Sequence, residues 1–451
     1  MLPTLTIARN TLTEALRQPV VFIIVVVSGI LQVLSVWWSA YSMGFRSEPG
    51  EVAADDKLLF DIGLSTIFVC GMLLAAFIAT AVISREIENK TILTMVSKPL
   101  PRPAVVIGKF LGVAAAMLIA STVMLIFLML ALRHGVLSTA ADDPDQPVWV
   151  FGMGAVILSL LIAGAGNYLY SWSFPQTMML CLTPLSVIAY IAVLAVSKKW
   201  ELQPLGTDFK GQVLLACLAL IAAIIVMTAI AVAASTRLGQ VMTIVVCAGV
   251  FALGLLTNYF FGRVAFNNEP VATIAEARGP DPIVDSFSRS GDRYIIRLVT
   301  PPEVELKRGM QILYGPSPNG LGTVNRWSPT TPPEGILEND LFGPDVPSAV
   351  VITQVDDLTY TLRNIGSPPA RLWRPPAAGD FVFVKPTDVN PVFAGLWALT
   401  PNMHFFWLVD AVSQGRPIPL RHVLLVLGYA FCLVVTFLSF SVVLFQGRDV
   451  G

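Results

Sequence analysis

Seven stretches of this 451-residue chain contain no charged side chain, and each is long enough to cross a lipid bilayer as a helix. They are residues 20–45, 62–84, 110–132, 146–197, 211–236, 238–262 and 422–447. A membrane-spanning helix needs about 20 apolar residues, whereas the strands of a membrane barrel alternate in polarity and run about 10 residues. Only 13% of the chain is charged, against about 25% in an ordinary soluble domain. The stretches therefore exclude a soluble globular protein and a porin-like barrel, and they predict an all-α polytopic membrane protein.

The stretch 146–197 is long enough for two helices, and we expect a break near 170–176. Pro175 disfavours a helical conformation at Phe174, and the aromatic residues beside it suit a membrane interface. We therefore expect about eight spans, with six core spans plus two more as the alternative. An even number places both termini on one side of the membrane, and the Lys and Arg residues of the short loops weakly favour the cytoplasmic side. The expected spans are 20–41, 60–83, 106–132, 148–169, 177–197, 212–234, 239–262 and 422–445.

Residues 1–19 precede the first span and predict an amphipathic helix that lies on the inner membrane surface. One face of this helix would carry apolar side chains, which suits an interfacial helix. A frayed cytoplasmic tail is the alternative. The first apolar run is longer than the core of a signal peptide, so we do not expect cleavage. The residues of the expected apolar face are Leu5, Ala8, Leu12, Ala15 and Leu16.

A polar insertion at 263–391 separates the seventh span from the eighth. Short β-type runs recur in it, and 350–355 with 358–362 predict a hairpin that turns at Asp356 and Asp357. We therefore expect a small all-β barrel or sandwich outside the membrane. The insertion has no cysteine, no histidine and no phosphate-binding loop, so it reads as a binding or docking module rather than an enzyme. Residues 392–420 predict one or two short re-entrant or interfacial helices, followed by the last span and a tail at 421–451.

The expected spans contain almost no ionisable residue, although an ion-coupled carrier usually needs one at mid-membrane. The polar candidates for a substrate pathway are Gln32, Asn167 and Asn258, and such residues more often hydrogen-bond one helix to another. A secondary carrier or channel is therefore disfavoured, and the energy for transport must come from elsewhere. The acidic motif at 142–145 resembles half of a magnesium–diphosphate site, but no second acidic cluster accompanies it, so we expect a solvated turn there. We expect no catalytic site, no metal site and no nucleic-acid partner.

The loop between the second and third spans, 84–105, differs from the other short loops. It is rich in basic residues, carries two glutamates, and contains a run at 91–96 that predicts a short helix with an apolar face. A proline cluster at Pro99, Pro101 and Pro103 ends this run. A cytoplasmic partner protein could bind a charged, partly apolar helix of this kind. A positively charged membrane anchor without a partner is an equally good interpretation of the composition alone.

This loop resembles the signature of ABC-2 type transporter permeases, the transmembrane subunits of ATP-driven exporters. In that family a Glu-x-Glu-x-x-Thr segment leads into a short coupling helix, and a Pro-x-x-Arg turn and a Gly-Lys pair follow. Residues 233–238 also resemble an inner turn of the family, and 444–451 resemble its C-terminal tail. Lys90 stands where many relatives have glycine. The matching residues are Glu86, Glu88, Thr91, Pro99, Arg102, Gly108 and Lys109.

The resemblance implies a permease subunit in a bacterial inner membrane, not itself an enzyme, driven by a separate ATPase that binds ATP and magnesium. That ATPase would dock on the coupling helix, with Arg85 and Glu86 orienting it, and the permease would pair with a second copy or a paralogue. We expect export of an amphipathic or lipid-linked substrate. The alternative is a mechanotransmitter that acts through the β domain on an envelope protein without transport. The expected coupling residues are Arg85, Glu86, Glu88, Thr91, Ile92, Leu93, Met95, Pro99, Arg102 and Lys109.

Overall fold

The structure is a computed structural model, and it describes most of the chain in two compact units. One unit comprises Met1–Gly254 with Met403–Gly451, and the other comprises Leu255–Asn402. The expected coupling helix at 91–96 lies outside the described residues. These are 2–38, 54–84, 101–136, 144–279, 287–317, 329, 346–367, 369–370, 372, 374–413 and 418–446.

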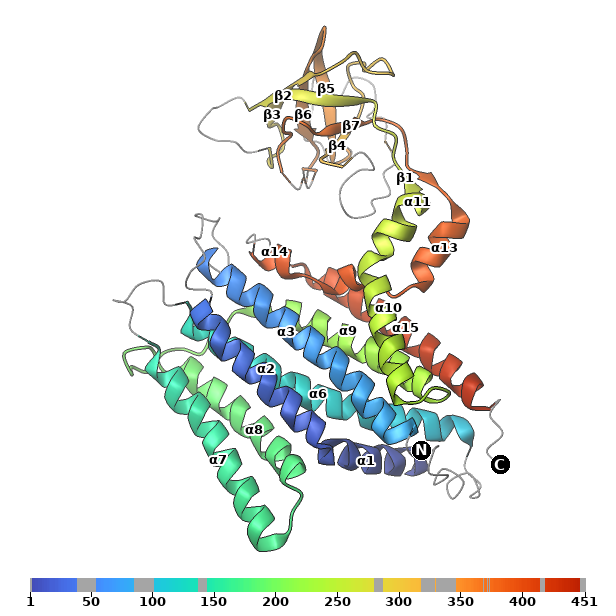
Figure 1. Ribbon diagram of the computed structural model, residues 1–451. Helices are drawn as coiled ribbons and strands as arrows, with labels where there is room; N and C mark the ends of the chain where they lie inside the picture. The colour runs from blue at the N-terminus through green and yellow to red at the C-terminus, as the bar shows by residue number, and fades with distance from the viewer. Residues whose placement is uncertain are drawn as a thin grey trace. The chain divides into compact units, whose positions relative to one another are not determined.

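The described residues contain eight helices that are long and apolar enough to cross a membrane, which confirms the predicted number. Short π-helical turns continue two of them, η2 (Thr80–Ser84) after α3 and η3 (Asn258–Gly262) after α10. A further helix, α1 (Leu2–Arg17), precedes the first span (Figure 1). The eight are α2 (Pro19–Trp38), α3 (Ala54–Ala79), α6 (Arg102–His134), α7 (Gln146–Tyr170), α8 (Phe174–Ala195), α9 (Gly211–Ser235), α10 (Gln240–Thr257) and α15 (Leu420–Gln446).

Burial separates these helices into central and peripheral ones, a distinction that hydropathy alone does not make. In α3, α6 and α9, 67% of the most apolar window is buried, whereas the value for α7 is 17%. Many of the buried side chains of α9 are alanines, and small residues let neighbouring helices approach closely. The helical unit is therefore organised around α3, α6 and α9.

Helix α1 packs against the first turns of α6 through two glycines. A Cβ atom on Gly112 would lie 2.5 Å from the carbonyl oxygen of Ala8, and one on Gly108 would lie 2.9 Å from the Cβ of Ile7. The buried side of α1 includes Ile7, whereas Leu5, which we expected on the apolar face, is 62% exposed. The face of α1 is thus set by the close approach to α6 as well as by amphipathicity.

The hairpin between α7 and α8 breaks the long uncharged stretch inside the expected window. Ser171 ends α7 in the left-handed region at φ 53°. The side-chain amide of Asn167 donates to the carbonyl oxygen of Trp172 at 2.6 Å. The indole of Trp172 lies against Gly166, where a Cβ would be 2.4 Å from the ring. Pro175 follows in the first turn of α8, where a missing N–H has no cost.

The second unit contains a small antiparallel sheet with the strand order β4-β7-β2-β3-β6-β5. The chain just before β4 also pairs with β5, because Gly309 N donates to Ile352 O at 2.8 Å and Ile312 N donates to Val350 O at 2.9 Å. These bonds join the two edges of the sheet, so the predicted all-β domain closes on itself. The strands are β2 (Ala272–Arg278), β3 (Arg293–Leu298), β4 (Leu313–Gly315), β5 (Ala349–Asp356), β6 (Thr359–Ile365) and β7 (Phe381–Phe383).

The predicted hairpin of β5 and β6 is present, but its turn lies one residue later than expected. Asp356 pairs with Thr359, so the turn consists of Asp357 and Leu358. Asp357 has φ 51°, a left-handed conformation that aspartate tolerates better than most residues. Strand β2 was not predicted, because its alternation of small and charged residues carries little β propensity.

The chain enters and leaves the sheet at one place. Strands β1 (Phe266–Asn267) and β8 (Asp388–Val389) pair antiparallel, with Asn267 opposite Asp388. They are flanked by α11 (Arg263–Ala265) and α13 (Pro391–Leu399). The indole N–H of Trp397 in α13 donates to Asn258 Oδ1 at 3.0 Å, and Asn402 Nδ2 donates to the same oxygen at 2.6 Å. Two further short helices, η4 (Met403–Phe406) and α14 (Val409–Ser413), lead to α15.

Candidate coupling site and outer ion-pair cluster

The expected coupling loop is described only at its two stems. Arg85, Glu86, Glu88, Thr91, Ile92, Leu93, Met95 and Pro99 lie outside the described residues. The stems are the C-terminal end of α3, continued by η2, and the N-terminal end of α6. Both become buried close to the loop: Thr80 and Val82 are 0% exposed on one side, and Val105 and Lys109 are each 2% exposed on the other. Thr80 Oγ1 also donates to the carbonyl oxygen of Ala76 at 2.9 Å, within the π-helical turn. A force on the loop would therefore enter the helical core directly.

Arg102 is the first residue of α6, and it contacts the far end of the chain. Its Nη1 donates to the carbonyl oxygen of Gln446, the last residue of α15, at 2.8 Å. Arg237, in the turn after α9, donates from Nε to the carbonyl oxygen of Leu444 at 2.9 Å. The last carbonyls of a helix lack intrahelical partners, and the negative end of the helix dipole favours a cation. The two arginines therefore cap the C-terminus of α15.

This cap unites three segments that resemble the permease family separately in sequence. They are the Pro-x-x-Arg turn ending at Arg102, the inner turn at 233–238, and the tail that begins at residue 444. Arg102 and Gln446 are 344 residues apart along the chain. No local pattern could have predicted that these segments meet at the start of α6, beside the expected coupling loop.

The three pathway candidates lie in different settings. Gln32 is buried in α2 and donates from Nε2 to Ser28 Oγ at 3.1 Å, while its Oε1 has no hydrogen-bond partner among the described residues. Asn167 is exposed and holds the α7–α8 turn. Asn258 belongs to the other unit and accepts from Trp397 and Asn402. Asn167 and Asn258 thus have local structural bonds, and Gln32 alone keeps a buried polar atom unused.

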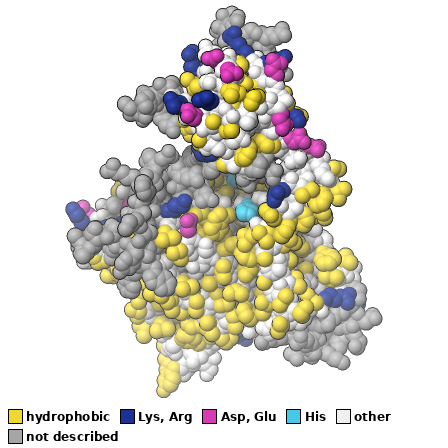
Figure 2. Space-filling view, turned by 45° about the horizontal axis from the view of Figure 1, so that its top comes forward, with side chains coloured by type: hydrophobic (Ala, Val, Ile, Leu, Met, Phe, Trp, Pro, Cys, Tyr) yellow, Lys and Arg dark blue, Asp and Glu magenta, His cyan; other side chains and the backbone are white. Residues whose placement is uncertain are grey.

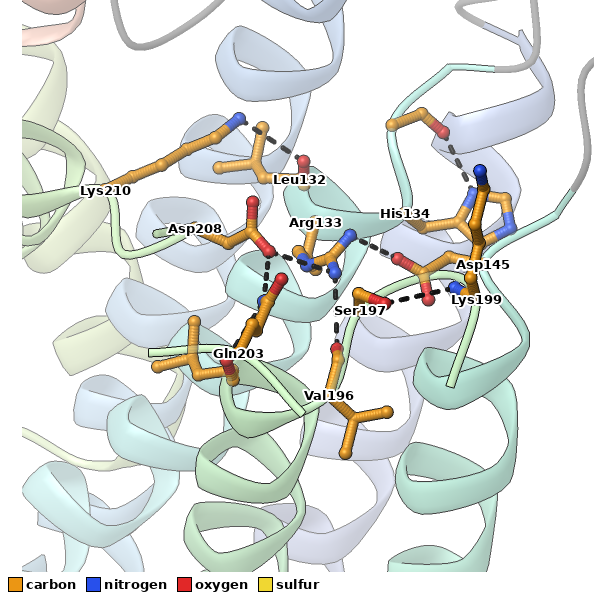
Figure 3. A network of polar contacts seen from close by, with 12 residues as sticks. Leu132, Arg133, His134, Asp145, Val196, Ser197, Lys199, Gln203, Asp208 and Lys210 are labelled. Carbon is orange, nitrogen blue, oxygen red and sulfur yellow. Dashed lines mark hydrogen bonds and ion pairs between the residues drawn. The ribbon is translucent and has the colours of Figure 1, made fainter. Parts of the chain in front are cut away.

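A second polar site, which the sequence analysis missed, lies at the opposite end of α6 (Figure 3). Arg133 forms an ion pair from Nη1 to Asp145 Oδ2 at 2.5 Å and from Nη2 to Asp208 Oδ2 at 3.0 Å. Gln203 Nε2 donates to the same oxygen of Asp208 at 2.5 Å, and Lys210 Nζ donates to the carbonyl oxygen of Leu132 at 3.3 Å. This cluster, which we call the outer ion-pair cluster because the expected topology places it on the outer side, joins the end of α6 to the start of α7 and to the loop between α8 and α9.

The expectation of a solvated turn at 142–145 is wrong for Asp145. Its side chain is 0% exposed, and the Arg133 side chain is 9% exposed. Asp145 precedes α7 without capping it, because its carboxylate turns to the guanidinium at the end of the preceding helix. One feature of the sequence indicates this ion pair: Arg133 and Asp145 stand on either side of the short connection between α6 and α7.

The outer ion-pair cluster is not fully satisfied. Among the described residues, Arg133 Nε, Asp145 Oδ1 and His134 Nε2 are buried without a hydrogen-bond partner. His134 Nδ1 lies 2.9 Å from the carbonyl oxygen of Gly135, and its ring packs edge-on against Trp149. Buried polar atoms without partners are rare in native proteins and costly.

Figure 2 shows a broad face of hydrophobic side chains on this protein, with Lys, Arg, Asp and Glu gathered away from it. The exposed large hydrophobic residues include many of α7, among them Leu158, Leu161 and Leu169. Exposed apolar area of this extent on long helices is typical of contact with lipid. The eight helices therefore make the chain a multi-pass membrane protein.

Comparison with protein families matches residues 5–276 to the family described as ABC-2 family transporter protein. The match begins in α1, includes the first seven apolar helices and ends within β2. Comparison with curated proteins finds no similar protein, and comparison with solved structures finds none either. The matched segment is more than half of the chain and contains the stems of the expected coupling loop. The chain therefore belongs to the ABC-2 transporter family, as the membrane-embedded permease subunit of an ABC transporter.

Proposed function

We propose that this chain is the permease of an ATP-driven exporter in a bacterial inner membrane, with cytoplasmic termini. A separate ATPase, which holds the ATP and magnesium, drives it through the loop at 84–105. The observation that carries the proposal is the burial of both stems of that loop. A loop anchored in the central helices α3 and α6 passes force into the core, whereas a loop between peripheral helices would move them alone.

The nature of the spans supports an external power source and an apolar cargo. The buried polar side chains of the described spans are mostly uncharged, as at Gln32 and Thr228, so they offer little to an ion-coupled cycle. The broad exposed apolar face of α7 suits contact with an amphipathic or lipid-linked substrate. It equally suits contact with a second permease beside it in the membrane. One permease supplies half of a pathway, so we expect a homodimer or a heterodimer.

The coupling role is tested by replacing two charges in the loop. Arg85→Ala with Glu86→Ala should weaken binding of the ATPase about tenfold or more, because charge pairs at an interface orient the partner and slow its release. The matched control is Lys199→Ala with Glu201→Ala, an exposed pair in the loop between α8 and α9. Co-purification of the ATPase with purified permease variants is the measurement. Equal co-purification of both variants would remove the loop from the coupling mechanism.

A mechanotransmitter is the second candidate function, and the presence of the β domain is the observation that favours it. The sheet has its own buried core and attaches through one strand pair, so an envelope protein could respond to it as a separate body. Because Asn267 pairs with Asp388, a two-residue turn can replace residues 268–387 and preserve both ends. Efflux from proteoliposomes that survives this deletion would exclude a role in signalling alone. If the deletion abolishes an effect of the permease on the cell envelope and leaves efflux intact, a signalling role in addition to transport would be favoured.

A further inference from the structure

We propose that Arg102 and Arg237 are positioning residues that tie the last span, α15, to the exit of the coupling loop. Movement of the loop would then reach α15 as well as α6. This inference rests on the coupling role proposed above for the loop at 84–105. It adds a specific set of contacts that would transmit that movement from the loop to α15.

The geometry places both arginines at the inner end of α15. Arg102 Nη1 lies 2.8 Å from the carbonyl oxygen of Gln446, and Arg237 Nε lies 2.9 Å from that of Leu444. Arg102 begins α6 within the last residues of the loop at 84–105, and Arg237 follows α9. A hydrogen bond from a charged donor is about twice as strong as a neutral one. The end of α15 is therefore held at two points by two different helices.

The N-terminal half of α15 packs against η4 through aromatic rings. Tyr429 of α15 stacks on Phe406 with ring centroids 5.9 Å apart, and it meets Phe405 edge-on at 5.6 Å. Both phenylalanines belong to η4, which follows the β-containing unit directly in the chain. A shift of α15 along its axis would move η4 with it, because Phe406 is only 1% exposed and well packed.

These contacts form a continuous route from the loop to η4, which follows the insertion and α13 in the chain. The loop moves Arg102, Arg102 and Arg237 hold the inner end of α15, and Tyr429 carries η4. Arg237 is exposed and Arg102 is half-buried, so neither side chain fills a core position whose loss would unfold the helices. Loss of the two arginines should therefore disturb the transmission of movement more than the fold.

The experiment measures movement of α15 relative to α6 in the intact permease–ATPase complex. Spin labels are placed at Leu118→Cys and Leu425→Cys, two positions that are 46% and 64% exposed, after Cys432→Ser removes an exposed native thiol. Electron–electron double resonance gives the distance distribution with and without ATP and vanadate. The parent complex should show a nucleotide-dependent shift in this distribution.

Three variants then test the two arginines. Arg102→Ala with Arg237→Ala should reduce the shift by half or more in the complexes that still assemble with the ATPase. Arg102→Lys with Arg237→Lys should restore it, because lysine also donates to terminal carbonyls and favours the same end of the dipole. Arg421→Ala, an exposed arginine at the other end of α15, should leave it unchanged. A full shift in the double alanine variant would overturn the proposal.

Hydrogen exchange on the permease alone tests the contact without any ATPase. Amides near the end of α15, at 440–446, should exchange about tenfold faster in the double alanine variant, because the capped turn frays more often. Unchanged exchange there would overturn the proposal even if transport is coupled as described. Failure of the parent to bind any ATPase would refute the proposed function instead, and the two failures are thus distinguishable.

Discussion

The contact between α1 and α6 gives a prediction that can be worked out in detail from two glycines. A Cβ on Gly112 would lie 2.5 Å from both Ala8 O and Thr11 Cβ, whereas ordinary contact begins near 3.4 Å. Helix α1 would have to retreat by about 0.9 Å, because the carbonyl oxygen belongs to its backbone and cannot rotate away. Gly112→Ala should therefore displace α1 from the base of α6.

The expected cost follows from two opposing terms. Forcing extra atoms into a packed contact costs about 1–3 kcal/mol. Replacing a helical glycine by alanine returns up to about 1 kcal/mol through helix propensity. The net loss of unfolding free energy for Gly112→Ala should be about 1–2 kcal/mol. Gly108→Ala should lose less, because its closest contacts, including the Ile7 side chain, are at 2.9 Å.

Gly164→Ala in α7 is the matched control, because nothing lies within 4 Å of the Cβ it would add. It should be neutral or slightly stabilising. Unfolding of the purified permease in mixed micelles with rising sodium dodecyl sulfate, followed by the fluorescence of its nine tryptophans, gives the free energies. If Gly112→Ala is as stable as Gly164→Ala, the close packing of α1 on α6 is not what holds the two helices together.

Three further predictions concern the polar contacts. In the outer ion-pair cluster, Arg133→Met should lower the free energy of unfolding by about 3–5 kcal/mol in the same assay. Adding Asp145→Leu should recover part of the loss, because an unpaired buried charge is worse than no charge. Additive losses would contradict the pairing. Asn258→Leu removes an acceptor of two hydrogen bonds and should cost about 1–3 kcal/mol, seen as faster hydrogen exchange at 391–402; unchanged exchange there would contradict the role of this side chain. Burial raises the pKa of Tyr314, so its stabilising effect is complete below the ordinary tyrosine pKa of about 10 and is lost as pH rises through the folded-state pKa. Tyr314→Phe should lower the melting temperature at pH 7 through loss of the bond to Arg374 O, yet flatten its decline above pH 10; parallel curves for the two proteins would refute this.

The parts of the fold that were predictable are those written locally in the chain. Uncharged stretches determine where helices cross a bilayer, and alternation around Asp356 determines a hairpin, because both signals span only neighbouring residues. The strand β2 was missed because its residues have weak propensity, and only pairing with β3 and β7 makes it a strand. Ile7 is buried and Leu5 is exposed because the glycine pair of α6 decides which side of α1 packs against it, and amphipathicity does not show this.

The candidate site was predictable to a smaller extent. The resemblance located the coupling loop, and its residues from Arg85 to Pro99 remain predictions, since they lie outside the described part. The hydrogen bond from Arg102 to Gln446 joins residues that are 344 positions apart, so no local sequence pattern predicts it. Asp145 was assigned to solvent because its acidic neighbours in sequence are usually hydrated, whereas an arginine on the preceding helix decides its burial.

The length of α6 has a consequence for the membrane itself. The helix has 33 residues, which is about 50 Å at 1.5 Å per residue, whereas the hydrocarbon core is about 30 Å thick and the headgroup layers extend it to about 40–45 Å. Arg102 near one end and Arg133 near the other therefore reach the polar layers of opposite leaflets, and a change in bilayer thickness must be met by a change in the tilt of α6. Because α6 has an arginine contact at each end, a change in its tilt would also move the residues that these two arginines bind.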